Sequence, residues 1–199
     1  MSESSQAKPR SSPKRELLLD TAFRLFYAHG YHAVGIDTIL AEAGVAKMTL
    51  YNHFKSKDEL IVAALERRSS EISDDKLKAL AKVSSEPLSQ IEALFDWMDV
   101  WFRMPDFNGC AFLKAIAEYT DDDSPINQTV KKHKAASIAS LIDLCQELDV
   151  PDPKNLAQQI FLLLEGSIIQ AHTFGNADAA KLGKNAATTL IQAAKASPS

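Results

Sequence analysis

The sequence predicts an all-α fold of about nine helices, in which a three-helix head containing a helix-turn-helix precedes a larger helical body. Apolar residues recur every three or four positions in one segment after another, which is the spacing of a helix face. Ser-Pro or Asp-Pro pairs, which are typical helix starts, precede several of these segments. The chain has only 7 Gly and 8 Pro in 199 residues and shows no alternating apolar pattern, which argues against a β-rich fold with many turns.

The first elements follow a polar leader. Residues 1–13 are rich in Ser, Pro and basic residues, which predicts a flexible tail. After Pro13 an apolar face at helical spacing predicts the first helix, and Gly30 stands where a C-terminal cap belongs. Two short helices, over residues 36–43 and 47–54, follow.

A capping box predicts the start of a fourth helix. Ser56 is placed to accept hydrogen bonds from first-turn amides, and Glu59 is placed to reach back to the preceding backbone. The helix is expected to run at least to Arg68 and, in its longest interpretation, through Ala81. Five further helices are then expected: from Pro87 to the break at Met104-Pro105-Asp106, from Gly109 to Tyr119, from Pro125 to about Leu148, from Pro153 to Gly175, and from Asp178 to Ala194.

The segment from Ile36 to Phe54 predicts a DNA-binding surface. Two short helices joined by a tight turn that contains Gly44 form a helix-turn-helix, which lays its second helix in the major groove. Ile39 and Leu50 are expected to point inward. The outward face then carries a cation, hydroxyls, an amide and an imidazole, which suit phosphates and base edges. These residues are Lys47, Met48, Thr49, Tyr51, Asn52 and His53.

This region resembles the N-terminal signature of TetR-family transcriptional regulators over about 45 contiguous residues with its spacing intact. The matching strings are Gly30-Tyr31, Ile36-Asp37-Thr38-Ile39, Ala43-Gly44-Val45, Thr49-Leu50-Tyr51 and His53-Phe54-Lys55-Ser56-Lys57. The chain departs from the family pattern in two places. Val34-Gly35 stands where a Thr or Ser is usual, and Leu40 replaces a small residue.

The resemblance implies a homodimeric, usually repressing DNA-binding protein whose variable C-terminal domain binds a small molecule that releases the DNA. It places Lys47 and Met48 near base edges, and it places Thr49, Tyr51 and His53 mostly on phosphate. Lys57 would hold a phosphate at the start of the fourth helix, where free amides and the positive helix end also favour an anion. The implied domains are a flexible tail (1–13), a helix-turn-helix DNA-binding domain (14–57) and a ligand-binding and dimerisation domain (58–199).

The charge distribution agrees with DNA binding by the head. Residues 1–57 hold eight Lys or Arg and five Asp or Glu, a balance of +3, which leaves −7 for residues 58–199 out of a net −4. A local positive field matters more than the total charge when a polyanion docks at one end. The basic tail is expected to be a solubilising segment; the alternative is an arm that enters the minor groove.

Other function classes find little support. The N-terminus lacks the apolar core of a signal peptide and no run reaches the roughly 18 apolar residues of a membrane span, so a cytoplasmic protein with no membrane partner is expected. No catalytic motif of the GxSxG, P-loop or GxGxxG kind occurs, so no enzyme and no cofactor is expected. Asp121-Asp122-Asp123 suggests a helix-start turn more than a cation site, and no metal is expected. Cys110 and Cys145 are expected to be buried free thiols, with a redox switch as the alternative.

The aromatic segment from Pro87 to Tyr119 is the candidate sensor region. It holds both tryptophans, Trp97 and Trp101, at helical i, i+4 spacing. One face would fill the core and the other would line an apolar pocket for the effector, while the alternative is a plain aromatic core. The residues expected to line the pocket are Trp97, Trp101, Phe112, Ile116 and Glu165. Glu165 and His172 share a side of one helix and suit either a pocket or an interface.

The last two helices are expected to form the homodimer interface as half of a four-helix bundle. The expected interface residues are Phe161, Leu164, Ile168, Ala187, Leu190 and Ile191. The sequence therefore predicts a ligand-released repressor that binds a pseudo-palindromic double-stranded DNA operator as a homodimer. The alternatives are an effector-independent DNA-binding regulator whose body is a scaffold, and an all-helical enzyme with an incidental head.

Overall fold

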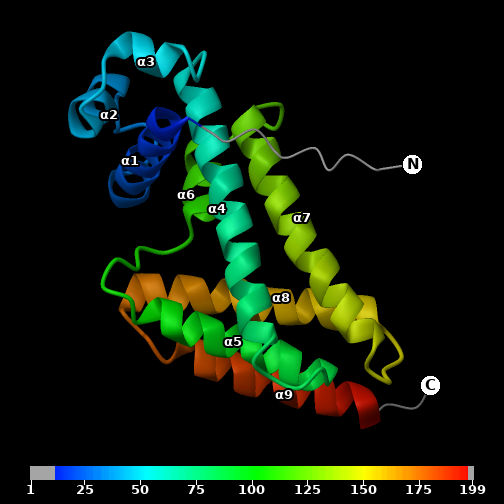
Figure 1. The fold of residues 1–199 in the computed structure, drawn as a ribbon. Coiled ribbons are helices and arrows are strands. Elements are labelled where there is room, and N and C mark those ends of the chain that lie inside the picture. The colour runs from blue at the N-terminus through cyan, green and yellow to red at the C-terminus, as the bar shows by residue number, and fades with distance from the viewer. Residues whose placement is uncertain (1–11, 197–199) are drawn as a thin grey trace, which may run out of the picture. The chain divides into compact units, whose positions relative to one another are not determined.

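A computed structural model describes residues 12–196, and within that range every regular element is a helix (Figure 1). The helices are α1 (Pro13–His29), α2 (Ile36–Ala43), α3 (Lys47–Tyr51), α4 (Lys57–Leu80), α5 (Pro87–Phe102), α6 (Ala111–Glu118), α7 (Pro125–Gln146), α8 (Pro153–Phe174) and α9 (Ala179–Ala196). The all-α prediction is confirmed, and so are nine helices among the described residues. Residues 1–11 of the predicted tail lie outside them.

Helix boundaries agree with the sequence signals except at the shortest helix. The third helix ends at Tyr51 and not at Phe54; it is followed by a turn at Asn52 and His53, in which the His53 amide bonds to the Leu50 carbonyl three residues before it. The fourth helix takes its longer form. Predicted caps are present: Ser124 Oγ accepts from the Ile126 amide at 3.3 Å, and an Asp152 carboxylate oxygen accepts from the Asn155 amide at 3.0 Å.

The chain divides into two compact units, one ending at Leu65 and the other beginning at Glu66. The first unit holds α1 to α3 and the beginning of α4, and the second holds the rest of α4 and α5 to α9. Within residues 12–196 no helix combines the length and the apolar character that crossing a membrane requires.

The first unit is held by a small core in which α1, α2 and α3 contact one another. Leu18 and Phe26 of α1, Ile39 of α2 and Leu50 of α3 are fully buried, as the apolar spacing predicts. Phe26 stacks on Tyr31 with ring centroids 5.2 Å apart, which fixes the chain after α1 against the same core. The packed core of α1, α2 and α3 therefore holds α3 in place and leaves its outer side exposed.

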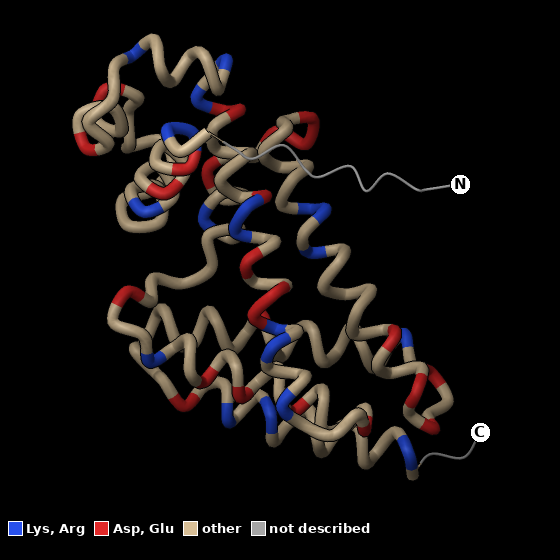
Figure 2. Tube along the Cα trace, viewed as in Figure 1, with Lys and Arg blue, Asp and Glu red and all other residues tan. Residues whose placement is uncertain are grey.

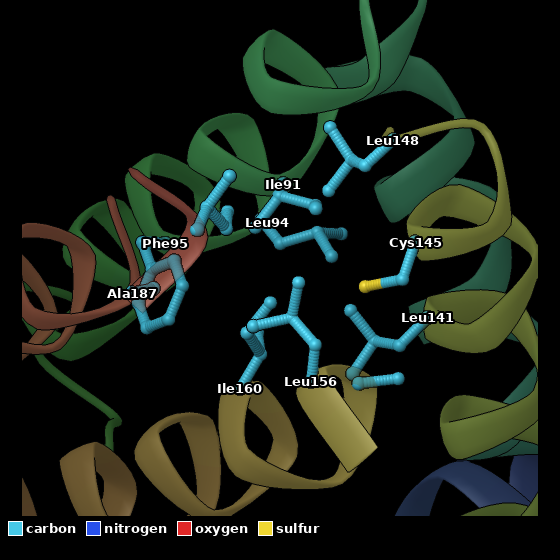
Figure 3. Close-up of a cluster of buried hydrophobic side chains, with 11 residues drawn as sticks. Ile91, Leu94, Phe95, Leu141, Cys145, Leu148, Leu156, Ile160 and Ala187 are labelled. Atoms are coloured by element: carbon cyan, nitrogen blue, oxygen red, sulfur yellow. The ribbon is translucent and has the colours of Figure 1, made fainter. Parts of the chain in front are cut away.

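The second unit is built around apolar side chains from four helices (Figure 3). Ile91, Leu94 and Phe95 of α5 meet residues of α7, α8 and α9 there. The other buried members are Leu141, Cys145, Leu148, Leu156, Ala157, Ile160, Ala187 and Ile191. Burial raises the pKa of the Cys145 thiol to about 11, so this cysteine behaves as a small apolar core residue.

A glycine sets the spacing between α9 and its neighbours. A Cβ on Gly183 would lie 2.8 Å from Phe95 Cε1 and would also collide with Ser167 Oγ. Ser167 is buried and donates its hydroxyl hydrogen to the Leu163 carbonyl at 2.7 Å, so it needs no partner on α9. Only a residue without a side chain lets α9 approach both α5 and α8 this closely.

Candidate functional site

The turn between α2 and α3 has the geometry that a helix-turn-helix needs. Gly44 has φ 63° and ψ 33°, the left-handed conformation that glycine adopts without strain. The Val45 amide bonds to the Leu40 carbonyl at 3.2 Å and closes the turn. Leu40 itself is buried, so the larger residue at this position is accommodated in the core.

The outer side of α3 is exposed. Met48 is 71% and Tyr51 46% accessible, the Lys47 side chain is 62% accessible, and Asn52 is exposed as well. Thr49 and His53 are half-buried at the edge of this face. Lys47 Nζ lies 3.7 Å from an Asp37 carboxylate oxygen, but both groups are open to water, so the pair is weak.

Basic positions lie at both ends of the α3 segment (Figure 2). At the far end, the predicted capping box is confirmed: the Glu59 amide donates to Ser56 Oγ at 3.1 Å, and Glu59 Oε2 accepts from the Lys55 amide at 2.7 Å. Lys57 Nζ lies 6.0 Å from the centre of the Phe26 ring and 3.4 Å from the His32 carbonyl oxygen. The Lys57 ammonium is thus held beside the head at the start of α4.

A cavity of about 200 Å³ lies inside the second unit. Its walls come from α4, α5, α7 and α8, with Cys110 and Phe112 from the start of α6. Trp97 and Trp101 stack on each other with centroids 5.8 Å apart and line one wall. The remaining wall is mostly apolar, with Met98, Leu141, Leu144, Phe161, Leu164 and Ile168 among its residues.

Charged groups also face this cavity. Lys134 of α7 and Glu165 of α8 form a two-pronged ion pair, with Nζ 2.6 and 2.7 Å from the carboxylate oxygens. Lys134 Nζ is also 3.7 Å from Cys110 Sγ. Lys76 of α4 places its ammonium 5.8 Å from the centre of the Trp97 ring. Burial, then repulsion from Lys134, lowers the pKa of Lys76.

His133 ties three helices together beside the cavity. Its ring stacks on Phe112 of α6 at 3.7 Å with an interplanar angle of 5°, and its Nδ1 lies 2.7 Å from the Ser69 hydroxyl of α4. Burial, reinforced by the nearby charges of Lys134, Lys76 and Arg68, lowers the pKa of His133 to about 4. The neutral ring at pH 7 leaves two ammonium groups and one carboxylate facing the cavity.

The structure brings together four of the five residues expected to line the pocket. Trp97, Trp101, Phe112 and Glu165 line the cavity, whereas Ile116, one turn along α6 from Phe112, does not. His172 lies apart from Glu165: its ring is 3.1 Å from the Asn108 side-chain oxygen, away from this cavity. Lys76, His133 and Lys134 were not anticipated, because each stands in a polar stretch that reads as a solvent-facing side of a helix.

Of the six residues expected at the dimer interface, three are buried in their own chain and three are half-buried. Ile168, Ala187 and Ile191 are buried, the last two at 1% accessibility. Phe161 and Leu164 line the cavity, and Leu190 packs on the core cluster of α5, α7, α8 and α9. The surface that α8 and α9 leave open is on their other side, because Leu162, Ile169, Phe174 and Leu182 are exposed there.

The triple-aspartate segment is a helix-start turn. The Asp123 amide bonds to an Asp121 carboxylate oxygen at 3.1 Å, and Lys131 pairs with Asp122 at 3.0 Å. Within the described range no three His, Cys, Asp or Glu side chains gather as a metal ion would require.

The comparisons with known proteins match both the head and most of the chain. Residues 18–64 match the family described as bacterial regulatory proteins, tetR family. The crystal structure of a TetR-family transcriptional regulator from Streptomyces coelicolor superposes with a TM-score of 0.86 at 32% identity, covering 92% of this chain and 96% of that one.

Two curated relatives carry functional names. The transcriptional activator FasR of Mycolicibacterium smegmatis is 36% identical over 46% of this chain and 42% of its own length. The transcriptional repressor ComR of Escherichia coli is 29% identical over 92% of this chain and 91% of its own. With the exposed α3 and its helix-turn-helix, these matches identify the chain as a DNA-binding transcriptional regulator of the TetR family.

Proposed function

We propose that the protein is a repressor that binds a pseudo-palindromic operator as a homodimer and leaves it when a small molecule enters the cavity of the second unit. The observation that carries the DNA-binding part is the outer side of α3. This side is open to solvent, polar and basic at its ends, while Ile39 and Leu50 hold its inner side in the core.

In this proposal α3 enters the major groove. Lys47 and Met48, at its first turn, approach base edges. Thr49, Tyr51, Asn52 and His53 contact DNA mainly through phosphate. Lys57 contacts a further phosphate from the start of α4, exchanging its bond to the neutral His32 carbonyl for one to an anionic oxygen.

The proposed dimer uses the open side of α8 and α9. Leu162, at 71% accessibility, and Leu182, at 62%, are large apolar residues that gain from being covered. Pairing of these faces by a two-fold axis gives the four-helix arrangement expected of two subunits. Leu162→Glu with Leu182→Glu is expected to yield a monomer in light scattering, whereas Val100→Glu, an equally exposed apolar site on α5, leaves the dimer intact.

Release requires only that the ligand prefers the state that does not fit the operator. A preference of about 3 kcal/mol weakens operator binding roughly a hundredfold. The cavity supports a ligand-controlled regulator over one whose body is a plain scaffold. Charged groups inside a domain cost free energy, and a scaffold gains nothing from them in return. Repression is proposed by analogy with the relative that matches nearly the whole chain, which is named a repressor.

Selection of bound sequences from random duplexes with the full chain tests the proposal. The expected product is a pair of inverted half-sites about 34 Å apart, the spacing of two recognition helices. Its affinity should fall steeply with salt, with a slope of about −0.9 for each phosphate contact in a plot of the logarithms. A single half-site, or an affinity that ignores salt, would contradict the proposal, and operator affinity unchanged by every metabolite tried would favour the scaffold alternative.

A further inference from the structure

The cavity of the second unit holds one more positive than negative group. Lys134 is neutralised by Glu165, with both carboxylate oxygens within 2.7 Å of its Nζ. Lys76 forms no ion pair among residues 12–196; its ammonium lies over the face of the Trp97 ring and feels Glu165 only through a longer-range attraction. His133 is neutral at pH 7 because its pKa is about 4. The groups facing the cavity therefore leave the ammonium of Lys76 without a bonded counter-charge of its own.

An ammonium in this position favours an anion that enters the cavity. Taking a charge partly out of water costs free energy that only a counter-charge or hydrogen bonds return. The lowered pKa of Lys76 reflects that cost, since burial is its first cause and repulsion from Lys134 its second. A carboxylate beside Lys76 would offset both effects, because its negative charge stabilises the ammonium. Ser73, one turn earlier on α4, also lines the cavity and offers a hydroxyl donor next to the ammonium.

The rest of the cavity favours a flat apolar body of limited size. Trp97 and Trp101 present stacked indole rings, and Phe112 and Phe161 add further aromatic wall. An apolar cavity of about 150 Å³ engineered into another protein binds one benzene molecule. The volume here, about 200 Å³, accordingly accepts one aromatic ring with a short substituent.

We propose that the effector is a small monocyclic aromatic acid, whose carboxylate pairs with Lys76 while its ring stacks against Trp97 and Trp101. This inference rests on the proposed ligand-binding role of the cavity and names the chemical class that the cavity selects. Both carboxylate oxygens of Glu165 are already held by Lys134, so Lys76 is the cation left to pair with the acid.

The two tryptophans provide a direct measurement. They are the chain's only tryptophans and both line the cavity, so intrinsic fluorescence reports on its contents without DNA. The probes are phenylacetate, its neutral counterpart phenylacetamide and the cationic phenethylamine, titrated into the full-length protein. Phenylacetate is expected to give a saturable change with a Kd about 10- to 100-fold below that of phenylacetamide, the size of effect of a hydrogen-bonded charge. Phenethylamine should bind most weakly.

Variants assign that preference to Lys76. Lys76→Gln is expected to bring phenylacetate to the affinity of phenylacetamide, whose unchanged binding also shows that the cavity is intact. Lys76→Arg keeps the charge and should keep the preference. Lys78→Gln is the matched control, because Lys78 lies on the same helix, is exposed and pairs with Asp75. Equal binding of acid and amide by the unmodified protein, no saturable change with any probe, or an acid preference that survives in Lys76→Gln would overturn the proposal.

A parallel titration of the protein–operator complex separates this inference from the proposed function. If phenylacetate binds with the expected preference but leaves operator affinity unchanged, the ligand class stands and ligand-controlled release fails. If the acid preference is missing while another compound releases the operator, release stands and the ligand class fails.

Discussion

The outer side of α3 and the cavity of the second unit are assembled from the chain in opposite ways. The α3 surface uses consecutive residues, Lys47 to His53, carried on one short helix and its turn. The cavity gathers Lys76, Trp97, Lys134 and Glu165 from four different helices. A surface that meets a regular partner such as duplex DNA can be encoded locally, whereas a chamber that encloses a small molecule needs walls from several elements.

The largest expected effect is on the free energy of unfolding, after a substitution in the core of the second unit. Phe95→Ala removes a fully buried ring from the core of α5, α7, α8 and α9 and is expected to cost about 3–5 kcal/mol of the free energy of unfolding. Denaturant titration followed by circular dichroism measures the loss. A cost below about 1 kcal/mol would mean that this core does not support the cavity walls.

The α3 surface should show the opposite behaviour, with function lost and stability kept. Lys47→Ala and Tyr51→Ala are each expected to weaken operator binding by about 1–3 kcal/mol, roughly 5- to 150-fold. Because both side chains are exposed, the free energy of unfolding should change by no more than about 0.5 kcal/mol. Gel-shift titration gives the affinity. Lys195→Ala, an exposed lysine of α9, is the control that should alter neither quantity, and an equal loss of affinity there would assign the effect to net charge alone.

A substitution in the turn before α3 is expected to lower both stability and operator affinity. Gly44→Ala places a side chain in the left-handed conformation, which costs about 1–2 kcal/mol, although a Cβ there meets nothing within 4 Å. The expected result is a modest fall in the free energy of unfolding together with weaker operator binding, measured on the same sample. Gly166→Ala, in the helical backbone of α8 with equally open space, should not be destabilising. Equal losses in the two variants would remove the conformational explanation.

A further expected effect is one of pH. The pKa of His133 is about 4 in the folded chain and 6.5 as its ordinary value, so between these pH values the unfolded chain binds a proton that the folded chain does not. This contribution to stability is complete above pH 6.5 and declines as the pH falls toward 4. The melting temperature should therefore fall less between pH 7 and pH 5 in His133→Gln than in the unmodified protein. His32→Gln, at an exposed histidine, should follow the unmodified protein, and parallel curves for all three would contradict the assignment.

The sequence sufficed where the signals are local. Helix starts and ends are marked by residues that lie within a few positions of them. Examples are Pro125 and Pro153 with their caps, Gly30 and Gly44 at helix ends, and the Ser56–Glu59 capping box. Helical spacing likewise separated the inner from the outer side of α3, because only one core lies against that helix.

The sequence was less informative where a residue's environment depends on distant elements. Lys134 and Glu165 lie 31 positions apart, and only the packing of α7 on α8 makes them partners. On α8 and α9, the apolar spacing does not show which apolar residues pack against the chain's own core and which stay exposed. Both helices carry large apolar residues on two sides, for example Ile168 and Ile169, so spacing alone could not decide.

The contact at Gly183 has a consequence for how the second unit responds to an occupied cavity. Helix interfaces without free volume transmit a displacement to their neighbours, since protein interiors are packed as densely as organic crystals and are hardly compressible. No methyl group fits between Gly183 of α9, Phe95 of α5 and Ser167 of α8. Sliding or rotation of these three helices against one another is therefore restricted at this contact. If a ligand enters the cavity, we expect the displacement to fall on the opposite wall, which α4 and α7 provide.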